Sequence, residues 1–352
     1  MSDALSDFIS TSPDWRKTLK QNNRRTIIVV GLFFLIYTGI GFLIDMVMVA
    51  SRYPKATLPQ IADALIHFQI FPIATFILLG VAFVSLFVAV LLADKLMLLG
   101  TDYHEITPST AKTLQEKQLY NVVEEMKIAA GLRYMPKVYL IDADYMNAFA
   151  SGFSEKSAMV AITRGLIEKL DRDELQAVMA HELSHIRHLD IKITITASLL
   201  ANMTLMVLDV FFYNAIFSSR SSDGEDGRSR NTLTTILIIL RYLLPVVNII
   251  MLLYLSRSRE LMADAGCVAI TRDNQPLARA LLKISGDHQQ NKRAYTKQYQ
   301  QTPHENVRRE AYIFDPSQAG ISSFNSVSDV FSTHPSLSAR LKALGFETKD
   351  DK

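Results

Sequence analysis

The stretch His181-Glu182-Leu183-Ser184-His185 carries more information than any other part of this chain. On a helix, two histidines four positions apart point to one face, about 40° from each other around the axis. Their imidazole rings can then take neighbouring corners of a tetrahedral Zn²⁺ site. Glu182 would lie beside the open corner, where a carboxylate can accept a proton from water. A helix with two ordinary histidines would show the same spacing, so the motif needs support from the rest of the chain.

The sequence around this motif predicts a water-exposed α+β segment at residues 96–190. Apolar positions at helical spacing predict a helix at residues 111–131, and a shorter helix follows at 165–170. Three short apolar runs, at residues 136–141, 147–152 and 158–163, predict strands of a small sheet. Asp171 and Glu174 form a predicted capping box for the helix that carries the motif, and a charged helix start indicates that this helix begins in water.

Four apolar runs are long enough to cross a membrane as helices. They cover residues 26–49, 71–92, 193–217 and 231–255, and each exceeds the roughly 18 residues that a spanning helix needs. Five lysine or arginine residues precede the first run, whereas Arg52 and Lys55 are the only lysine or arginine residues in the segment 50–70. This asymmetry predicts that the N-terminus and the segment after the second run lie in the cytoplasm.

The third and fourth runs predict a hairpin joined by the polar loop at residues 218–230. Each run holds one charged residue, Asp209 or Arg241, at a comparable distance from the loop. A lone charge inside a bilayer is costly, so we expect these two side chains to pair. A buried helical hairpin in a soluble domain would be an alternative interpretation of the two runs.

A zinc peptidase needs a third protein ligand, and the third histidine of the extended form of the motif is absent here. A hairpin that enters and leaves the membrane returns its two flanks to the same side. One flank carries His181 and His185, and the other carries Glu260. Asp264 lies four residues further on, where it could accept the free N–H of a liganding histidine. Taken alone, Glu260 and Asp264 would fit an ordinary exposed helix face beside Arg257.

At this point the chain resembles a known family, the HtpX-type membrane zinc metalloproteases, which are relatives of the CAAX prenyl endopeptidases. Four sequence blocks carry the resemblance, in order over about 200 residues. They are Asn147-Ala148-Phe149-Ala150; Ala180-His181-Glu182-Leu183-Ser184-His185 with Asp190; Ser256-Arg257 with Glu260, Ala263 and Asp264; and Phe331-Ser332-Thr333-His334-Pro335 with Arg340.

The resemblance implies zinc-dependent endopeptidase activity and a gluzincin-like α+β domain on the cytoplasmic side of the inner membrane. It implies one Zn²⁺ per chain, held by His181, His185 and Glu260. Asp264 would accept a hydrogen bond from the ring of a liganding histidine. It further implies that Glu182 is the general base and that His334, with Arg340 nearby, stabilises the oxyanion. The strand of Asn147, Ala148, Phe149 and Ala150 would pair with the substrate backbone.

Together these observations predict a mainly α membrane protein with four transmembrane helices and one peptidase domain in two parts. The expected segments are 1–25 in the cytoplasm, 26–95 with the first two spans, 96–192 with the histidine motif, 193–255 as a hairpin in or on the membrane, and 256–352 with the third ligand. A polar, glutamine-rich insert at residues 286–315 departs from smaller family members, and we expect its part near residues 289–301 to be exposed.

The amino-acid composition limits the classes of binding partner that the chain is expected to have. A net charge of +2 over 352 residues gives no indication of nucleic-acid binding, and the single cysteine, Cys267, excludes an intrachain disulfide. The expected partners are the lipid bilayer and protein or peptide substrates, chiefly misfolded or membrane proteins, and the sequence does not indicate an oligomeric state. Two alternatives remain open: a CAAX-type prenyl-peptide protease, and a non-catalytic scaffold or chaperone with a structural zinc.

Overall fold

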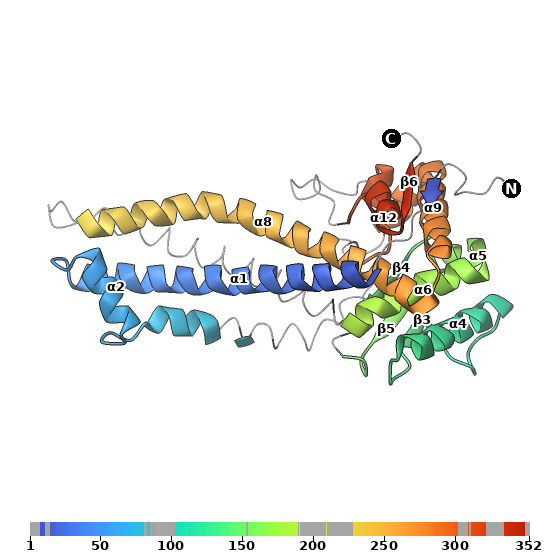
Figure 1. The fold of residues 1–352 in the computed structure, drawn as a ribbon, viewed down its shortest axis with the longest axis horizontal. Helices are drawn as coiled ribbons and strands as arrows, with labels where there is room; N and C mark the ends of the chain where they lie inside the picture. Colours follow the sequence, from blue (N-terminus) through green and yellow to red (C-terminus); the bar gives the residue numbers. More distant parts are fainter. Residues whose placement is uncertain are drawn as a thin grey trace. The chain divides into compact units, whose positions relative to one another are not determined.

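The structure is a computed structural model of the chain (Figure 1). It describes residues 8–10, 15–80, 83–84, 87, 103–152, 154–188, 190, 209, 228–301, 309, 311–321 and 334–348. The chain divides into two compact units. The first comprises Met1–Thr26, Leu91–Ile193 and Leu253–Lys352, and the second comprises Ile27–Val90 and Thr194–Leu252. The described part is mostly helical with a small mixed sheet, which confirms the expected combination of helices and a minor sheet.

The first unit is built on a four-stranded sheet. Its strands are β2 (Tyr103–Ile106), β3 (Lys137–Ile141), β4 (Ala148–Ser151) and β5 (Met159–Thr163), in the spatial order β2-β3-β5-β4. Strands β3 and β5 are parallel, and the two outer strands run antiparallel to their neighbours. The three predicted strands are confirmed, while β2 was not predicted. Strand β4 lies at the edge of the sheet.

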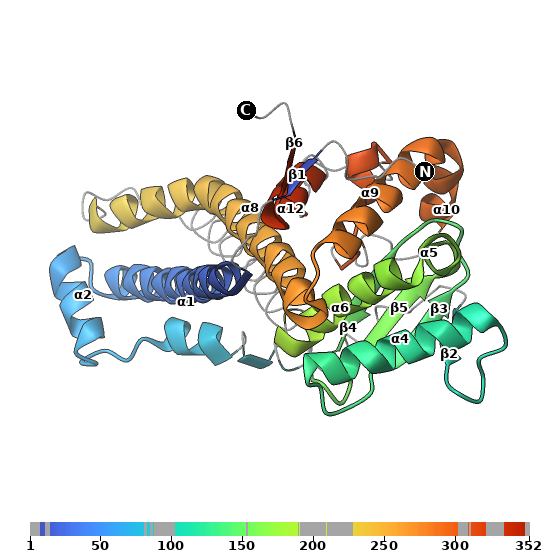
Figure 2. The ribbon, with the colours of Figure 1, turned by 45° about the vertical axis from the view of Figure 1, so that its right-hand side comes forward.

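Two long helices pack beside this sheet. Helices α4 (Leu114–Ala130) and α6 (Arg172–His188) contact each other, and α6 also contacts β4 (Figure 2). The short helix α5 (Arg164–Lys169) precedes α6. The predicted capping box is confirmed, because the Glu174 N–H donates to Asp171 Oδ1 at 2.9 Å and the Asp171 N–H donates to Glu174 Oε2 at 3.0 Å. This cap fixes the start of α6, and the histidine motif follows in its buried last two turns.

The C-terminal part of the first unit is helical as well. It contains the end of α8 (Arg228–Thr271), α9 (Gln275–Gln290), α10 (Lys292–Gln301), the 3₁₀ helix η3 (Pro316–Ala319) and α12 (Leu337–Ala343). A second sheet pairs β1 (Phe8–Ser10) with β6 (Phe346–Thr348), which joins the two ends of the chain. The expected exposure near residues 289–301 is confirmed for most of α10, although Tyr295 and Tyr299 bury one face of this helix at 3% and 2% exposure.

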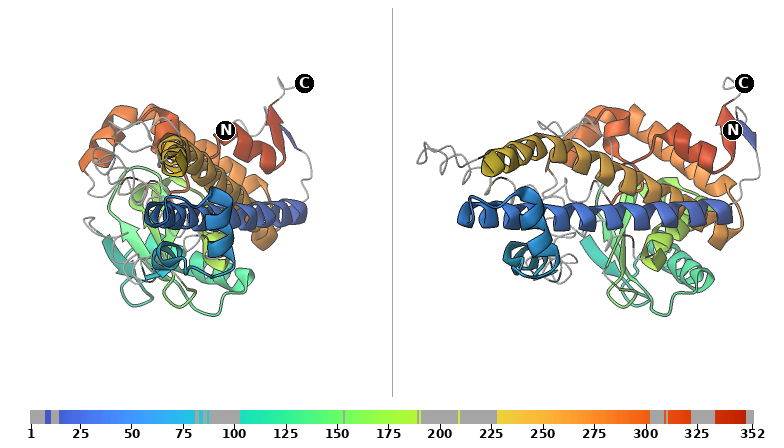
Figure 3. Two further views of the ribbon diagram at one scale, coloured as in Figure 1. Left: turned by 90° about the vertical axis from the view of Figure 1, so that its left-hand side faces the viewer. Right: turned by 60° about the vertical axis from the view of Figure 1, so that its left-hand side comes forward.

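The second unit contains α2 (Leu58–Ile66) and most of α1 (Trp15–Arg52). After α1 ends, α2 crosses beside its end, and Ile61 and Leu65 pack against Met46 and Val49 (Figure 3). Asp45, the single acid of the first apolar run, is buried because it caps the helical residues 73–80. Its carboxylate accepts from the N–H groups of Ala74 and Thr75 at 2.8 and 2.9 Å and from the Thr75 hydroxyl at 2.7 Å.

Two helices in the described part of the chain are long and apolar enough to cross a membrane. They are Phe34–Arg52 within α1 and Ile238–Thr271 within α8. Four spans were expected. Part of the run at 71–92 lies outside the described residues, as do the run at 193–217 apart from Asp209 and the loop at 218–227.

The predicted pair between Asp209 and Arg241 is confirmed, with Arg241 Nε 2.7 Å from Asp209 Oδ1. Because the two residues stabilise each other, Asp209→Ala and Arg241→Ala are expected to destabilise the protein non-additively. A double-mutant cycle on thermal stability in detergent should give a coupling free energy of about 0.5–3 kcal/mol. Strictly additive effects would contradict a shared interaction.

Candidate active site

His181 and His185 on α6 and Glu260 on α8 bring their ligating atoms together in the first unit. The two Nε2 atoms lie 3.2 Å apart. Glu260 Oε2 lies 3.6 Å from His181 Nε2, and Glu260 Oε1 lies 3.5 Å from His185 Nε2. A tetrahedral metal with bonds of about 2.0–2.1 Å holds neighbouring ligand atoms about 3.3 Å apart. The three side chains, all buried, therefore have the spacing of a tetrahedral metal site.

The outer ring nitrogens show which atoms face the centre of the site. His181 Nδ1 lies 3.0 Å from Asp264 Oδ1, and His185 Nδ1 lies 2.9 Å from Asp190 Oδ2. An ionised carboxylate only accepts hydrogen bonds, so each Nδ1 carries the hydrogen and each Nε2 presents a lone pair. Two imidazole lone pairs and the Glu260 carboxylate then face one another in a buried space. Such a set of acceptors fits a cation.

Each of these outer carboxylates is itself held by an arginine. Arg340 forks onto Asp264, with Nε and Nη2 at 2.9 and 2.6 Å from its two oxygens. Arg259 Nε lies 3.6 Å from Asp190 Oδ1. Sequence reasoning assigned Asp264 this position but gave no role to Asp190 or Arg259. The available signal was the place of Asp190 in the sequence, five residues after His185 and in the same sequence block as the motif.

Glu182 is buried to 1% exposure, and neither of its carboxylate oxygens has a hydrogen-bond partner among the described residues. Burial raises the pKa of the Glu182 carboxyl, and the nearby His181 and His185 act against this rise. Burial also acts to raise the pKa of Glu260, but His334 and His181 more than offset it, so its pKa lies well below the ordinary value. Two adjacent carboxyls are thus pushed in opposite directions, as is typical of catalytic sites.

His334, just before α12, is 2% exposed, and its Nδ1 lies 3.4 Å from Glu260 Oε2. It reaches the same carboxylate as the two motif histidines. Arg340, also expected near the substrate, lies buried against Asp264, and its Nη1 is 3.9 Å from Glu260 Oε2. The remaining residues of that sequence block, 331–333, lie outside the described residues.

The strand block also lies in this unit. The side chains of Asn147, Ala148, Phe149 and Ala150 are all buried, with at most 2% exposure. Any pairing of a peptide with this strand would therefore use its backbone edge. Asn147 is occupied within the chain, because its Nδ2 donates to the Phe314 carbonyl at 3.0 Å and to the Tyr299 hydroxyl at 3.2 Å.

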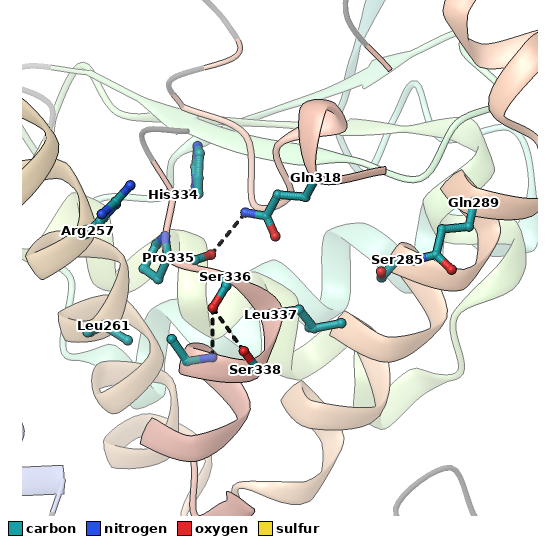
Figure 4. A pocket seen from close by; sticks show the side chains of 11 residues that line it. Arg257, Leu261, Ser285, Gln289, Gln318, His334, Pro335, Ser336, Leu337 and Ser338 are labelled. Atoms are coloured by element: carbon teal, nitrogen blue, oxygen red, sulfur yellow. Dashed lines mark hydrogen bonds between the residues drawn. The ribbon is translucent and has the colours of Figure 1, made fainter. Parts of the chain in front are cut away.

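A cavity of about 730 Å³ opens beside His334 (Figure 4). Arg257 and Leu261 line it from α8, and Ser285 and Gln289 line it from α9. Residues 334–339 lie between these helices, and the Gln318 side-chain amide donates to the Pro335 carbonyl at 3.0 Å. The cavity thus combines apolar and polar walls next to one of the candidate catalytic side chains.

A model of peptidase family M48 matches residues 113–347, more than half of the chain and the whole of the site. The chain belongs to peptidase family M48. It is 37% identical over 333 residues to a protease HtpX homolog of Helicobacter acinonychis, covering 94% of this chain and 98% of the relative. A protease HtpX homolog of Dictyoglomus thermophilum is 36% identical over 226 residues, which cover 64% of this chain and 68% of the relative.

The family assignment and the site agree. The chain is an M48 metallopeptidase, and a buried group of metal-binding side chains lies inside the matched region. A crystal structure of S. mikatae Ste24p is also similar, with a TM-score of 0.46 and 19% identity, covering 91% of this chain and 65% of that one. That likeness is too distant to add to the assignment.

Asp190→Asn tests whether this M48 peptidase depends on the carboxylate behind His185. Loss of the charge should weaken metal binding about 10- to 100-fold, because the imidazole is less basic and less firmly oriented. Competition with a chelator measures the affinity. Asp142→Asn, which changes an exposed carboxylate near Arg164, is the matched control and should leave metal affinity unchanged. Equal affinities of the two variants would show that Asp190 has no such role.

Gly266 on α8 allows this helix to approach α6. A Cβ at this position would lie 2.0 Å from Ser184 Oγ and 2.9 Å from Ser184 Cβ, so the two helices would have to separate. Gly266→Ala is expected to lower the free energy of unfolding by about 1–3 kcal/mol through overpacking and to weaken metal retention, since Glu260 lies on the same helix.

Gly286→Ala is the matched control for this substitution. Gly286 also lies within a helix, α9, but an added Cβ there meets nothing within 4 Å. It should be neutral or should stabilise the protein by about 0.5–1 kcal/mol. Thermal unfolding and metal analysis compare the two variants, and similar behaviour of both would contradict the close helix contact at Ser184.

Proposed function

We propose that this M48 peptidase holds one Zn²⁺ on His181, His185 and Glu260 and cleaves peptide bonds in misfolded or membrane-associated proteins. The observation that carries the proposal is the convergence of three buried side chains whose ligating atoms approach one another to 3.2–3.6 Å, with both outer imidazole nitrogens facing carboxylates. Two imidazoles and one carboxylate are a donor set typical of catalytic zinc, which also needs one open position.

Other residues of the site have separate proposed roles in the reaction. Zn²⁺ bound by such a set supplies Lewis acidity toward a carbonyl oxygen and makes water more acidic. Glu182, buried and without a hydrogen-bond partner among the described residues, is placed to accept a proton from the attacking water and to return it to the leaving amine. His334 is proposed to donate to the oxyanion, and Asp264 and Arg340 to orient His181. The backbone edge at Ala148 and Ala150 is proposed to pair with the substrate.

A membrane location is supported by the second unit. Large apolar side chains on α1 and α8 face outward there, including Leu35 at 70%, Tyr242 at 68% and Ile250 at 60% exposure. Contiguous exposed apolar surface of this kind is typical of contact with lipid. We propose four spans within residues 26–95 and 193–255. The parts 1–25, 96–192 and 256–352 would then lie on the cytoplasmic side of the inner membrane.

The experiment compares two substrates with the detergent-purified enzyme. We expect faster cleavage of an unfolded membrane protein than of a prenylated tetrapeptide, with no cleavage by enzyme stripped of metal. Preference for the prenylated peptide would instead support CAAX processing. Metal binding without cleavage of either would support a scaffold, although an unpartnered carboxylate at Glu182 has no purpose in a structural site.

A further inference from the structure

The outer edge of β4 has two residues whose backbone groups point away from the sheet. The Thr163 N–H donates to the Asn147 carbonyl at 3.0 Å, and β4 pairs with β5 in the same register. Backbone groups alternate along an antiparallel strand, so Phe149 and Ser151 also bond to β5. Ala148 and Ala150 therefore direct their N–H and C=O groups outward, to the edge proposed to bind substrate.

Part of this edge is already covered by residues 311–315, which we call the strap. Tyr312 forms an antiparallel bridge with Phe149, and the Ile313 N–H donates to the Ala148 carbonyl at 2.9 Å. The Asn147 side chain extends the pairing, since it donates to the Phe314 carbonyl at 3.0 Å and accepts from the Phe314 N–H at 3.3 Å. The strap thus pairs with β4 as an added antiparallel strand would.

Two candidate substrate-binding side chains also bind backbone carbonyls of this part of the chain. Arg340 Nη1 donates to the Ile313 carbonyl at 2.5 Å, and His334 Nε2 lies 3.2 Å from the Arg309 carbonyl. A carbonyl only accepts hydrogen bonds, so His334 Nε2 is the donor. The chain therefore places its own peptide groups both on the edge strand and on the side chain proposed to bind the reacting carbonyl.

The strap is held by an aromatic cluster. Tyr312 and Ile313 are each 1% exposed, and the Tyr312 hydroxyl lies 3.3 Å from the Tyr145 hydroxyl. The Tyr312 ring packs edge-on against Phe149 with centroids 5.8 Å apart. The bridge between Tyr312 and Phe149 also places Ala311 opposite Ala150, and Ala150 is 2% exposed. The strap therefore lies along both outward-facing residues of β4.

We propose that the strap is a built-in occupant of the substrate edge, which an incoming extended peptide displaces. The peptide can pair along β4 only as the strap leaves Ala148 and Ala150, so that one strand exchanges for another. His334 is freed from the Arg309 carbonyl in the same movement. The inference rests on the proposed endopeptidase function. It restricts the enzyme to substrates that offer an extended, unfolded backbone, because only these can compete for main-chain hydrogen bonds.

Hydrogen exchange in the full-length Glu182→Gln protein tests this without catalysis. The probe is reduced and carboxymethylated lactalbumin, an unfolded protein, and its binding is followed independently by fluorescence anisotropy. At saturating probe, exchange at residues 311–315 should rise about tenfold or more, while amides in the interior of the β3–β5 ladder stay protected. Bound probe with unchanged or slower exchange at the strap would overturn the strap alone. No binding at all would overturn the proposed function and the strap with it.

A matched pair of variants adds a kinetic readout in the enzyme with Glu182 intact. Tyr312→Leu removes the ring and hydroxyl contacts of the strap, whereas Tyr295→Leu removes a tyrosine that packs on Tyr145 from α10, outside the strap. When a larger fraction of the enzyme has the strap displaced from β4, the apparent affinity for an extended peptide rises by the same factor. Tyr312→Leu should therefore lower KM for the unfolded protein about three- to tenfold. Tyr295→Leu should leave KM unchanged. An equal KM in both variants would contradict the proposal. If Tyr312→Leu does not fold, the hydrogen-exchange measurement on the Glu182→Gln protein remains the test.

Discussion

Replacing Glu182 with glutamine is expected to lower kcat/KM for protein cleavage by about 10²–10⁴-fold, the usual contribution of a general base. The amide keeps the size of the side chain but cannot accept the proton of the attacking water. Because Glu182 is not one of the three side chains that converge as ligands, one metal ion per chain should remain bound. Cleavage of an unfolded protein and elemental analysis of the same preparation measure the two effects.

Glu168→Gln is the control for this substitution. Glu168 is a half-exposed carboxylate on α5 that pairs only at 3.4 Å with Arg164, so its loss should change neither cleavage nor metal content. A Glu182→Gln enzyme that cleaves as fast as the wild type would exclude Glu182 as the base. Loss of metal in that variant would instead show that the carboxylate contributes to metal binding.

Replacing Glu260 with glutamine should remove the metal, whereas replacing Glu182 should leave it bound. The neutral amide removes the single negative charge among the three ligands, so bound zinc should fall from about one per chain to near zero after dialysis against a chelator that leaves the wild type loaded. Cleavage should disappear with the metal. The variant also leaves His334 and the two motif histidines without their shared carboxylate, so a lower thermal stability is expected.

The two glutamine variants control each other, because both replace a buried carboxylate within the same site. Glu182→Gln should be inactive with metal, and Glu260→Gln should be inactive without it. If Glu260→Gln retained a full complement of zinc, the third ligand would have to be another residue, and the convergence on α8 would be a structural feature only.

Local sequence patterns predicted the part of the fold that depends on local interactions. The capping box of Asp171 and Glu174 fixed the start of α6, and the short apolar runs located β3, β4 and β5 within one or two residues. The approach of Glu260 to His181 was also foreseen, because a hairpin must return its flanks to one side. Gly266, which allows the close contact between α8 and α6, has no recognisable pattern in a single sequence.

Features that depend on distant partners were not predicted. Strands β1 and β6 are three residues each and pair the two ends of the chain, so neither has enough residues to show a period. The glutamine-rich composition of α10 concealed two buried tyrosines at helical spacing, Tyr295 and Tyr299. The strap was not predicted either, because its pairing with β4 joins residues more than 150 positions apart.

The central claim is that His181, His185 and Glu260 together hold a catalytic zinc ion. Zinc K-edge X-ray absorption on the purified full-length Glu182→Gln protein, which should not digest itself, tests it most directly. We predict one zinc per chain in a nitrogen and oxygen shell at about 2.0–2.2 Å, with scattering from two imidazoles and no sulfur. Substoichiometric zinc, a sulfur ligand, or a shell that is unchanged in the Glu260→Gln protein would contradict the account.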